Sequence, residues 1–125
     1  MKPLVTQKSV KMLLERFERG IDAQNIRITV KSATKIEVQL SLQDTHREYN
    51  WIDVVFEIDG VSDARLLEEN QLAHIDMSEG FSLIVTSCVT GFCIGNYTNS
   101  SNFRDSCLFI VGESLKYNEL PFSEV

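Results

Sequence analysis

Apolar positions recur at helical spacing near the start of the chain. Within residues 6–22 an apolar stripe occupies one helix face, while lysine, glutamate and arginine fill the other. Thr6 is the expected N-cap, and Gly20 loosens the final turn. The pattern therefore predicts an amphipathic helix over residues 6–22. Its apolar stripe consists of Val10, Leu13, Leu14, Phe17 and Ile21.

The spacing of apolar residues then changes to every second position. Three segments, 26–31, 35–42 and 51–58, alternate apolar and polar side chains, and a polar loop over residues 43–50 precedes the third. Such alternation is typical of strands with one side in the core and the other in water. A buried parallel sheet would show continuous apolar runs instead. The three segments therefore predict an antiparallel sheet with one solvent-facing side.

The second half of the chain predicts further strands. Asp59-Gly60 is a hairpin signal, followed by a short return strand within residues 61–67. Residues 68–80 are polar and irregular, with at most a short strand at 74–77. Residues 81–88 and 91–97 predict a second hairpin. Residues 107–117 are apolar on both faces, so we place this last strand in the centre of the sheet.

These elements predict a single α+β domain over residues 1–125. The N-terminal amphipathic helix is expected to pack on one face of an antiparallel sheet of about six strands. A chain of this length can bury one sufficient core. The side chains expected to point inward are Leu13, Leu14, Phe17, Ile28, Val30, Val38, Leu40, Val54, Phe56, Leu83, Val85, Phe109 and Val111.

Charge is divided unevenly along the chain. Residues 1–36 hold eight Lys/Arg and three Asp/Glu, whereas residues 37–125 hold four and fifteen. The acidic pI, about 4.8, disfavours a nucleic-acid partner, because binding phosphates needs a Lys/Arg surface. No apolar run approaches the roughly 20 residues that span a bilayer, and the first residues lack a signal-peptide pattern. We therefore expect a cytoplasmic protein with no nucleic-acid or membrane partner.

No catalytic set is evident, and we assign no catalytic residue, no metal ligand and no cofactor. Two patterns combine histidine with carboxylates that can bind divalent metals, although a solvated loop is the simpler interpretation. They are Asp44-x-His46-x-Glu48 and His74-Ile75-Asp76. No serine lies in a nucleophile elbow, and the glycines form no phosphate-binding loop. The cysteines lack metal-ligand spacing, so Cys88, Cys93 and Cys107 are expected to be buried reduced thiols.

Acidic residues are dense between positions 53 and 79, and Trp51 comes just before them. Trp51, Asp53, Val55 and Glu57 share one side of a predicted strand, the side opposite the core. An exposed tryptophan beside carboxylates is typical of protein interfaces. We therefore predict a partner-binding surface of Trp51, Asp53, Glu57 and Asp59. The alternatives are an ordinary solvated sheet face, or a small second core that buries Trp51.

The segment from Trp51 to Leu66 resembles part of a family. It reads Trp-Ile-Asp-Val-Val-Phe-Glu-Ile-Asp-Gly-Val-Ser-Asp-Ala-Arg-Leu and is similar to small uncharacterised bacterial domains grouped with the immunity proteins of polymorphic toxin systems. In these domains an aromatic residue opens a strand ending Phe-x-x-x-Gly-Val, and an arginine follows. Residues 107–117, leading into Glu119-Leu120, resemble their C-terminal end. The resemblance implies a cytosolic α+β binding protein and transfers no functional residue.

Three functions remain open at this point. The first is a non-enzymatic acidic protein-binding domain, such as an immunity protein that neutralises a basic toxin, since negative potential steers a cationic partner. The second is a small metal-dependent or hydrolytic enzyme that uses scattered carboxylates with His46 or His74. The third is a self-associating structural domain, a homodimer in which the face around Trp51 pairs two copies.

Overall fold

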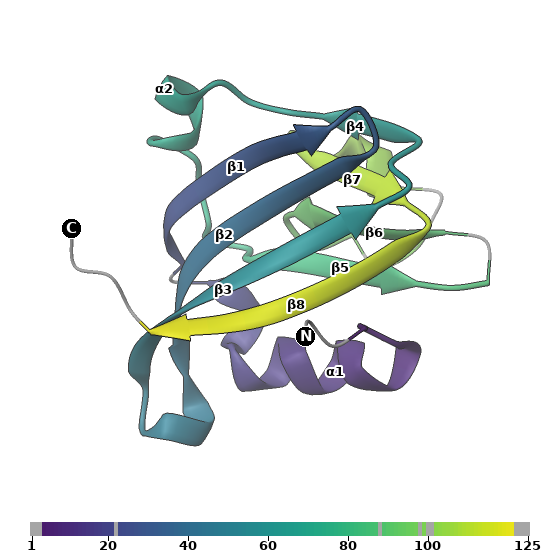
Figure 1. The fold of residues 1–125 in the computed structure, drawn as a ribbon. Coiled ribbons are helices and arrows are strands. Elements are labelled where there is room, and N and C mark those ends of the chain that lie inside the picture. The colour runs from purple at the N-terminus through teal and green to yellow at the C-terminus, as the bar shows by residue number, and fades with distance from the viewer. Residues whose placement is uncertain (1–3, 22, 88, 98, 100–101, 122–125) are drawn as a thin grey trace.

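The computed structural model describes residues 4–21, 23–87, 89–97, 99 and 102–121 of the chain. These residues form eight strands, two α-helices and three short 3₁₀ helices (Figure 1). The helices are α1 (Gln7–Arg16), η1 (Glu18–Gly20), η2 (Thr45–Arg47), α2 (Glu69–Leu72) and η3 (Phe103–Asp105). The strands are β1 (Gln24–Ser32), β2 (Lys35–Asp44), β3 (Asn50–Asp59), β4 (Asp63–Arg65), β5 (Phe81–Val85), β6 (Thr90–Ile94), β7 (Phe109–Gly112) and β8 (Ser114–Pro121).

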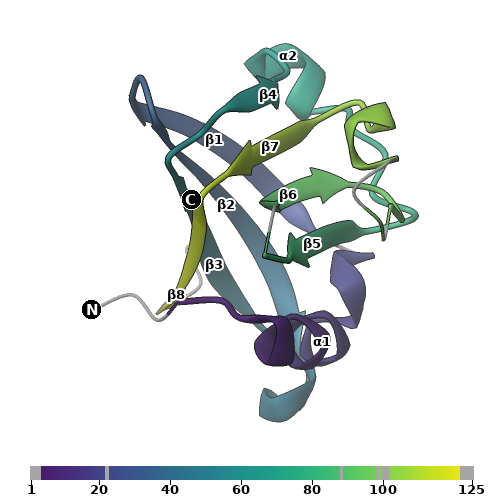
Figure 2. The same ribbon diagram turned by 90° about the vertical axis from the view of Figure 1, so that its right-hand side faces the viewer.

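The strands form two antiparallel sheets that face each other (Figure 2). Sheet A has the strand order β1-β2-β3-β8, and sheet B has the order β4-β7-β6-β5. Helix α1 lies across one end of this sandwich, next to β5. The α+β class is therefore confirmed, but the strands number eight in two sheets rather than about six in one.

Helix α1 begins as predicted and ends earlier. Thr6 is the N-cap, and its side chain and that of Ser9 form a reciprocal capping box. The helix ends at Arg16 because Glu18, Arg19 and Gly20 all adopt positive φ angles of 50°, 56° and 69°. A left-handed backbone cannot continue a right-handed helix. The predicted helix over residues 6–22 is therefore shortened to α1, with Phe17 buried at its C-cap, whereas Ile21 of the predicted apolar stripe is 47% exposed.

Sheet A confirms the three alternating segments. Strands β2 and β3 pair in register over ten residues, from Lys35 with Asp59 to Asp44 with Asn50. Val38, Leu40, Val54 and Phe56 are fully buried on the inner side. Strand β1 is less regular, because its pairing with β2 shifts between Gln24 and Arg27 and again near Ser32.

The predicted central strand over residues 107–117 is wrong. It is divided at Gly112 into β7, an inner strand of sheet B, and β8, an edge strand of sheet A. A Cβ at Gly112 would approach the carbonyl oxygen of Asp59 to 2.7 Å, so the backbones lie too close for a larger residue here. Glu113 then donates its backbone N–H to the same oxygen at 2.8 Å. The two sheets are joined at this corner.

Residues 68–80 also differ from expectation. They contain the short helix α2 rather than a strand at 74–77, and Leu72 and Met77 reach the core from this segment. The hairpin predicted at Asp59-Gly60 is wrong, because the short strand β4 pairs with β7 of sheet B and not with β3. The second predicted hairpin is formed by β5 and β6.

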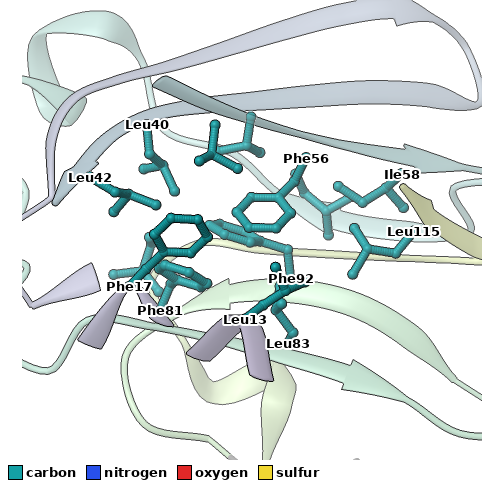
Figure 3. Close-up of a cluster of buried hydrophobic side chains, with 14 of the residues drawn as sticks. Leu13, Phe17, Leu40, Leu42, Phe56, Ile58, Phe81, Leu83, Phe92 and Leu115 are labelled. Atoms are coloured by element: carbon teal, nitrogen blue, oxygen red, sulfur yellow. The ribbon is translucent and has the colours of Figure 1, made fainter. Parts of the chain in front are cut away.

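One main core fills the space between the sheets (Figure 3). Phe56 of sheet A contacts Phe81 and Phe92 of sheet B, with ring centroids 5.4 and 5.6 Å apart. Leu13 and Phe17 close the core from the helical end. Aromatic pairs at such distances add to the stability that burial alone provides.

The side chains predicted to point inward are buried or partly buried at every position except Val30. Val30 is 58% exposed, because β1 is an edge strand and its end has no opposing layer. Phe109 and Val111 are buried, but in a second cluster, while Leu108 and Ile110 of the same segment face the main core. Both faces of β7 are apolar, so the alternation of apolar and polar residues could not show which face points into the main core. The second cluster consists of Ile84, Cys93, Phe103, Phe109 and Val111.

Candidate functional site: the outer face of sheet A and the end of the β2–β3 hairpin

The predicted partner-binding residues lie along the outer side of β3. Because Val54 and Phe56 point into the core, their neighbours Asp53, Val55 and Glu57 point the other way, as expected. Their exposure is nevertheless low, only 3% for Asp53 and 7% for Glu57. Side chains of the flanking strands cover these carboxylates. The outer face around them is therefore a packed polar layer.

Hydrogen bonds and ion pairs account for this packing. The Ser41 hydroxyl donates to Asp53 at 2.6 Å, and Glu57 lies between Glu37 of β2 and Lys116 of β8 in the register. Asp59 is within 3.6 Å of the ammonium groups of both Lys35 and Lys116. Carboxylates that already hold cations and hydroxyls offer a basic partner little unpaired charge.

The four predicted residues also do not converge on one point. Trp51 and Asp59 stand at opposite ends of β3, about 26 Å apart at the usual rise per strand residue. Trp51 is partly exposed, so it is neither fully solvated nor part of a sealed second core.

Beside Trp51 the β2–β3 connection projects beyond the sheets, on the side of the molecule that carries α1 (Figures 1 and 2). Here Glu48 and Tyr49 both adopt left-handed conformations, with φ angles of 57° and 65°. Each non-glycine residue in this region costs on the order of 1 kcal/mol or more. Tyr49 is 52% exposed. The hairpin end (residues 44–51) therefore presents Tyr49 on a strained turn, with Trp51 partly exposed at the start of the adjoining strand β3.

A buried ion-pair network holds the hairpin end to the body of the protein. Arg16 of α1 donates two hydrogen bonds to the carboxylate of Asp44, at 2.9 and 2.6 Å. Its guanidinium also donates to Glu119 of β8 at 2.6 Å. Arg47 contacts Asp44 at 3.2 Å and Glu119 at 3.3 Å. Two arginines and two carboxylates from four separate elements, α1, β2, η2 and β8, thus meet at the base of the hairpin end.

Asp44 is the centre of this network. Its side chain is fully buried and also accepts the backbone N–H of His46 at 2.9 Å. The hydrogen bonds from Arg16 lower the pKa of Asp44 below its ordinary value, against the opposing effect of burial. The same bonds raise the pKa of Arg16. Both groups are therefore charged at neutral pH, and their ion pair holds the turn in place.

The histidine patterns do not form metal sites among the described residues. Residues 44–48 form the η2 turn instead of an extended segment, so Asp44 points into the network while His46 and Glu48 are exposed. His74 is exposed as well. No group of three or more His, Cys, Asp or Glu side chains in the described part of the chain is arranged to hold a metal ion.

The cysteines differ in environment. Cys93 is buried as predicted, and burial raises the pKa of its thiol to about 12, so it is protonated at neutral pH. Cys107 is exposed, contrary to expectation, because it precedes β7 instead of lying inside a strand. Cys88 lies outside the described residues.

Negative charge is concentrated in the second half of the chain. Residues 1–65 hold ten Lys/Arg and ten Asp/Glu, whereas residues 66–125 hold two and eight. No lysine or arginine occurs between Arg65 and Arg104. The net charge of −6 therefore comes from the part of the sequence that contains α2 and the strands β5–β8, not from the strands β1–β4.

The hairpin end and its network were not predicted from the sequence. Asp44 was considered only as part of a polar loop or of a histidine-carboxylate pattern, and Arg16 and Glu119 are 103 positions apart. No local sequence pattern predicts an ion pair between residues so far apart in the chain. The one available signal was the pair of aromatic residues at the end of that loop, Tyr49 within it and Trp51 directly after it.

Comparisons of this chain with protein-family models, curated proteins and solved structures find no match. None of the described helices has the length and apolar character required to cross a membrane.

Proposed function

We propose that this chain is a non-enzymatic protein-binding domain whose anchor is the hairpin end with Tyr49 and Trp51. The observation that carries the proposal is an exposed aromatic side chain, Tyr49, on a strained turn that is held by an ion-pair network centred on buried Asp44, with Trp51 close by on the outer side of β3. Strained backbone conformations persist where surrounding structure enforces them, and they are frequent at binding sites. Aromatic residues on a fixed support lose little conformational entropy on binding and are enriched at interface hot spots.

The proposal keeps Trp51 at the centre of the binding surface and gives the carboxylates a smaller part. Asp53 and Glu57 support the outer face through their neighbours on β2 and β8. Asp59 would join the contact only if the partner covers the whole length of β3. A partner of standard interface size, roughly 800 Å² on each side, would reach that far.

An immunity protein that neutralises a basic toxin in the cytoplasm is the specific form of this function that we favour. The net charge of −6 and the resemblance of the segment from Trp51 to Leu66 to such domains support it. Negative potential raises the association rate of a cationic partner even when the contact surface itself is balanced.

The test uses the protein encoded by the neighbouring gene as the partner. Trp51→Ala and Tyr49→Ala should each weaken its binding about tenfold, the usual loss for an aromatic anchor, while the melting temperature stays nearly unchanged. Met12→Ala is the control, because Met12 is an exposed apolar residue of α1. It should leave affinity as it is.

Two results would contradict the proposal. A large drop in melting temperature for Trp51→Ala would mean that this side chain stabilises the fold instead of binding a partner. A concentration-dependent dimer that is lost in Tyr49→Ala would mean that the hairpin end pairs two copies of the chain.

A further inference from the structure

A groove of about 500 Å³ lies between β1 and the segment that begins with α2 (Figure 1). One wall consists of β1 with the residue before it, positions 23–28, and the other wall of residues between positions 72 and 77. This volume falls within the range of roughly 300–1,000 Å³ that is usual for sites of small organic ligands. The groove is therefore large enough to hold a small molecule.

Most of the groove is apolar. Leu72 and Met77 line it and belong to the main core, and Ile26, Ile28 and Ile75 line it and pack against that core. The last three side chains are only partly buried. An apolar ligand in the groove would remove more of this surface from water, which favours its binding.

Arg27 carries the only charge among the residues that line the groove. Within the described part of the chain its guanidinium forms no ion pair and no side-chain hydrogen bond. Lys31 of the same strand, in contrast, lies 3.7 Å from Glu37. The exposed Asp76 does not line the groove, and its carboxylate accepts the backbone N–H of Ser78 at 2.9 Å. A ligand in the groove would thus meet a single, positive charge.

The backbone of β1 adds further hydrogen-bond donors. Among the described residues β1 pairs with β2 alone, and no backbone hydrogen bond joins residues 24–32 to any other described segment. N–H groups on this edge are therefore open to an acceptor. The edge is not regular, because Asn25 has a φ of 54° and the register shifts between Gln24 and Arg27. Such a bulge disfavours the addition of a long peptide strand and leaves room for a smaller ligand.

We propose that the groove binds a small amphiphilic carboxylic acid, with one unbranched alkyl chain and one carboxylate. The alkyl chain lies against Ile26, Ile28 and Ile75, and the carboxylate accepts hydrogen bonds from Arg27 at the edge of the groove. Carboxylates are ionised at neutral pH, and their hydrogen bonds with a guanidinium are stronger than those of neutral groups. A cationic head group would place like charges side by side.

The probe is decanoate, used below the concentration at which it forms micelles. In ¹⁵N-resolved NMR spectra of the whole chain, it should shift amide signals of residues 23–28 and 72–77. It should also raise the melting temperature, because a ligand that binds only the folded state stabilises that state.

Three related compounds separate the contributions of the head group and the chain. Decanol keeps the chain without the charge and should bind about fivefold more weakly, the upper range for one exposed ion pair. Decyltrimethylammonium, with the opposite charge, should bind more weakly than decanol. Hexanoate keeps the carboxylate on a shorter chain and should bind at least about tenfold more weakly than decanoate, because it buries fewer methylene groups.

Two pairs of variants test the location. Arg27→Gln should reduce the affinity for decanoate to that for decanol, whereas Lys31→Gln, on the same strand but outside the groove, should leave it unchanged. Ala73→Phe fills the groove and should weaken binding of both compounds about tenfold or more. Ala64→Phe makes the same change at an exposed alanine of β4 and should have no effect.

Several outcomes would overturn the proposal. These are no binding of decanoate, equal affinity for decanoate and decyltrimethylammonium, or decanoate binding that Arg27→Gln leaves unchanged. A fall in melting temperature would show that decanoate acts as a surfactant on the unfolded chain. Groove signals that shift with anionic phospholipid vesicles but not with decanoate would assign the groove to a membrane surface. Trp51→Ala should bind decanoate normally, so the result does not depend on the function proposed for the hairpin end.

Discussion

At the scale of single residues, Asp44 links the strained hairpin end to the rest of the protein. Among the described residues of the network, only Asp44 both contacts the two arginines, Arg16 and Arg47, and accepts a backbone N–H of the turn, from His46. Removing one partner of a buried ion pair leaves the other charge without compensation, which costs more than the pair itself contributes.

Asp44→Asn should therefore lower the free energy of unfolding by about 3 kcal/mol, since an amide cannot accept both Arg16 hydrogen bonds. Urea unfolding measures this loss. The matched control is Asp63→Asn, because Asp63 pairs with Arg104 where both side chains are about half exposed, 48% and 49%. That change should cost less than about 1 kcal/mol. Equal losses in the two variants would show that the network adds nothing beyond a surface pair.

The same residue shows what local sequence information omits. The sequence predicts that Asp44 lies in a solvated loop, because the eight successive residues from position 43 to 50 are almost all hydrophilic. Its burial depends on Arg16, which is 28 positions earlier. Likewise, the alternation of β3 correctly predicted the side on which Asp53 and Glu57 lie. It could not predict their low exposure, which depends on the lengths of side chains on β2 and β8.

At the scale of elements, the aromatic cluster holds the two sheets together. Phe92 of β6 lies 5.6 Å from Phe56 of sheet A and 5.5 Å from Phe81 of β5, centroid to centroid. Since Phe92 is fully buried, its truncation leaves a cavity that the neighbouring strands cannot fill.

Phe92→Ala should cost about 3–5 kcal/mol of unfolding free energy, the usual range for a buried phenylalanine. Thermal or urea unfolding measures the loss. Phe92→Leu keeps much of the volume and should cost markedly less, below about 2 kcal/mol. If the two variants lose the same amount, ring contacts across the sheets, not the filled volume, determine the stability.

Elements were predictable where their surroundings were simple. The hairpins of β1, β2 and β3 have one buried and one outer side, so alternation identified them. The segment at 107–117 has two buried sides, one facing each cluster, and alternation carries no information there. Its division at Gly112 depends on the close approach of Asp59, a contact between strands far apart in sequence.

At the scale of the whole molecule, stability should fall in acid. Asp44 has a lowered pKa in the folded state, so its contribution is fully present above the unfolded value of about 3.9. It is lost as the pH falls through the lower folded value. We expect the melting temperature to drop below about pH 4, and Asp44→Asn to show a shallower drop than the parent chain. Identical slopes would place the acid sensitivity in other carboxylates.

The class of the molecule followed from its patterning, whereas its division into two sheets did not. Helical spacing followed by alternation is enough to predict α+β. Which strands belong to which sheet depends on contacts between distant segments, such as Leu4 with Lys116 and Ser62 with Val111. The change in net charge at position 65 is visible in the sequence. It separates the electrically balanced segment that contains β1–β4 from the acidic segment that contains the later strands.

The corner at Gly112 has a consequence for motion. Among the described residues, the backbone hydrogen bonds from Glu113 to Asp59 and from Ser62 to Val111 hold the end of β3 and the loop after it against the end of β7. The opposite side, with β1 and β5, is joined through side chains and short helices. Local opening follows the least-bonded contacts first. We therefore expect partial unfolding to begin on the side where β1 lies, while the contacts around Gly112 persist.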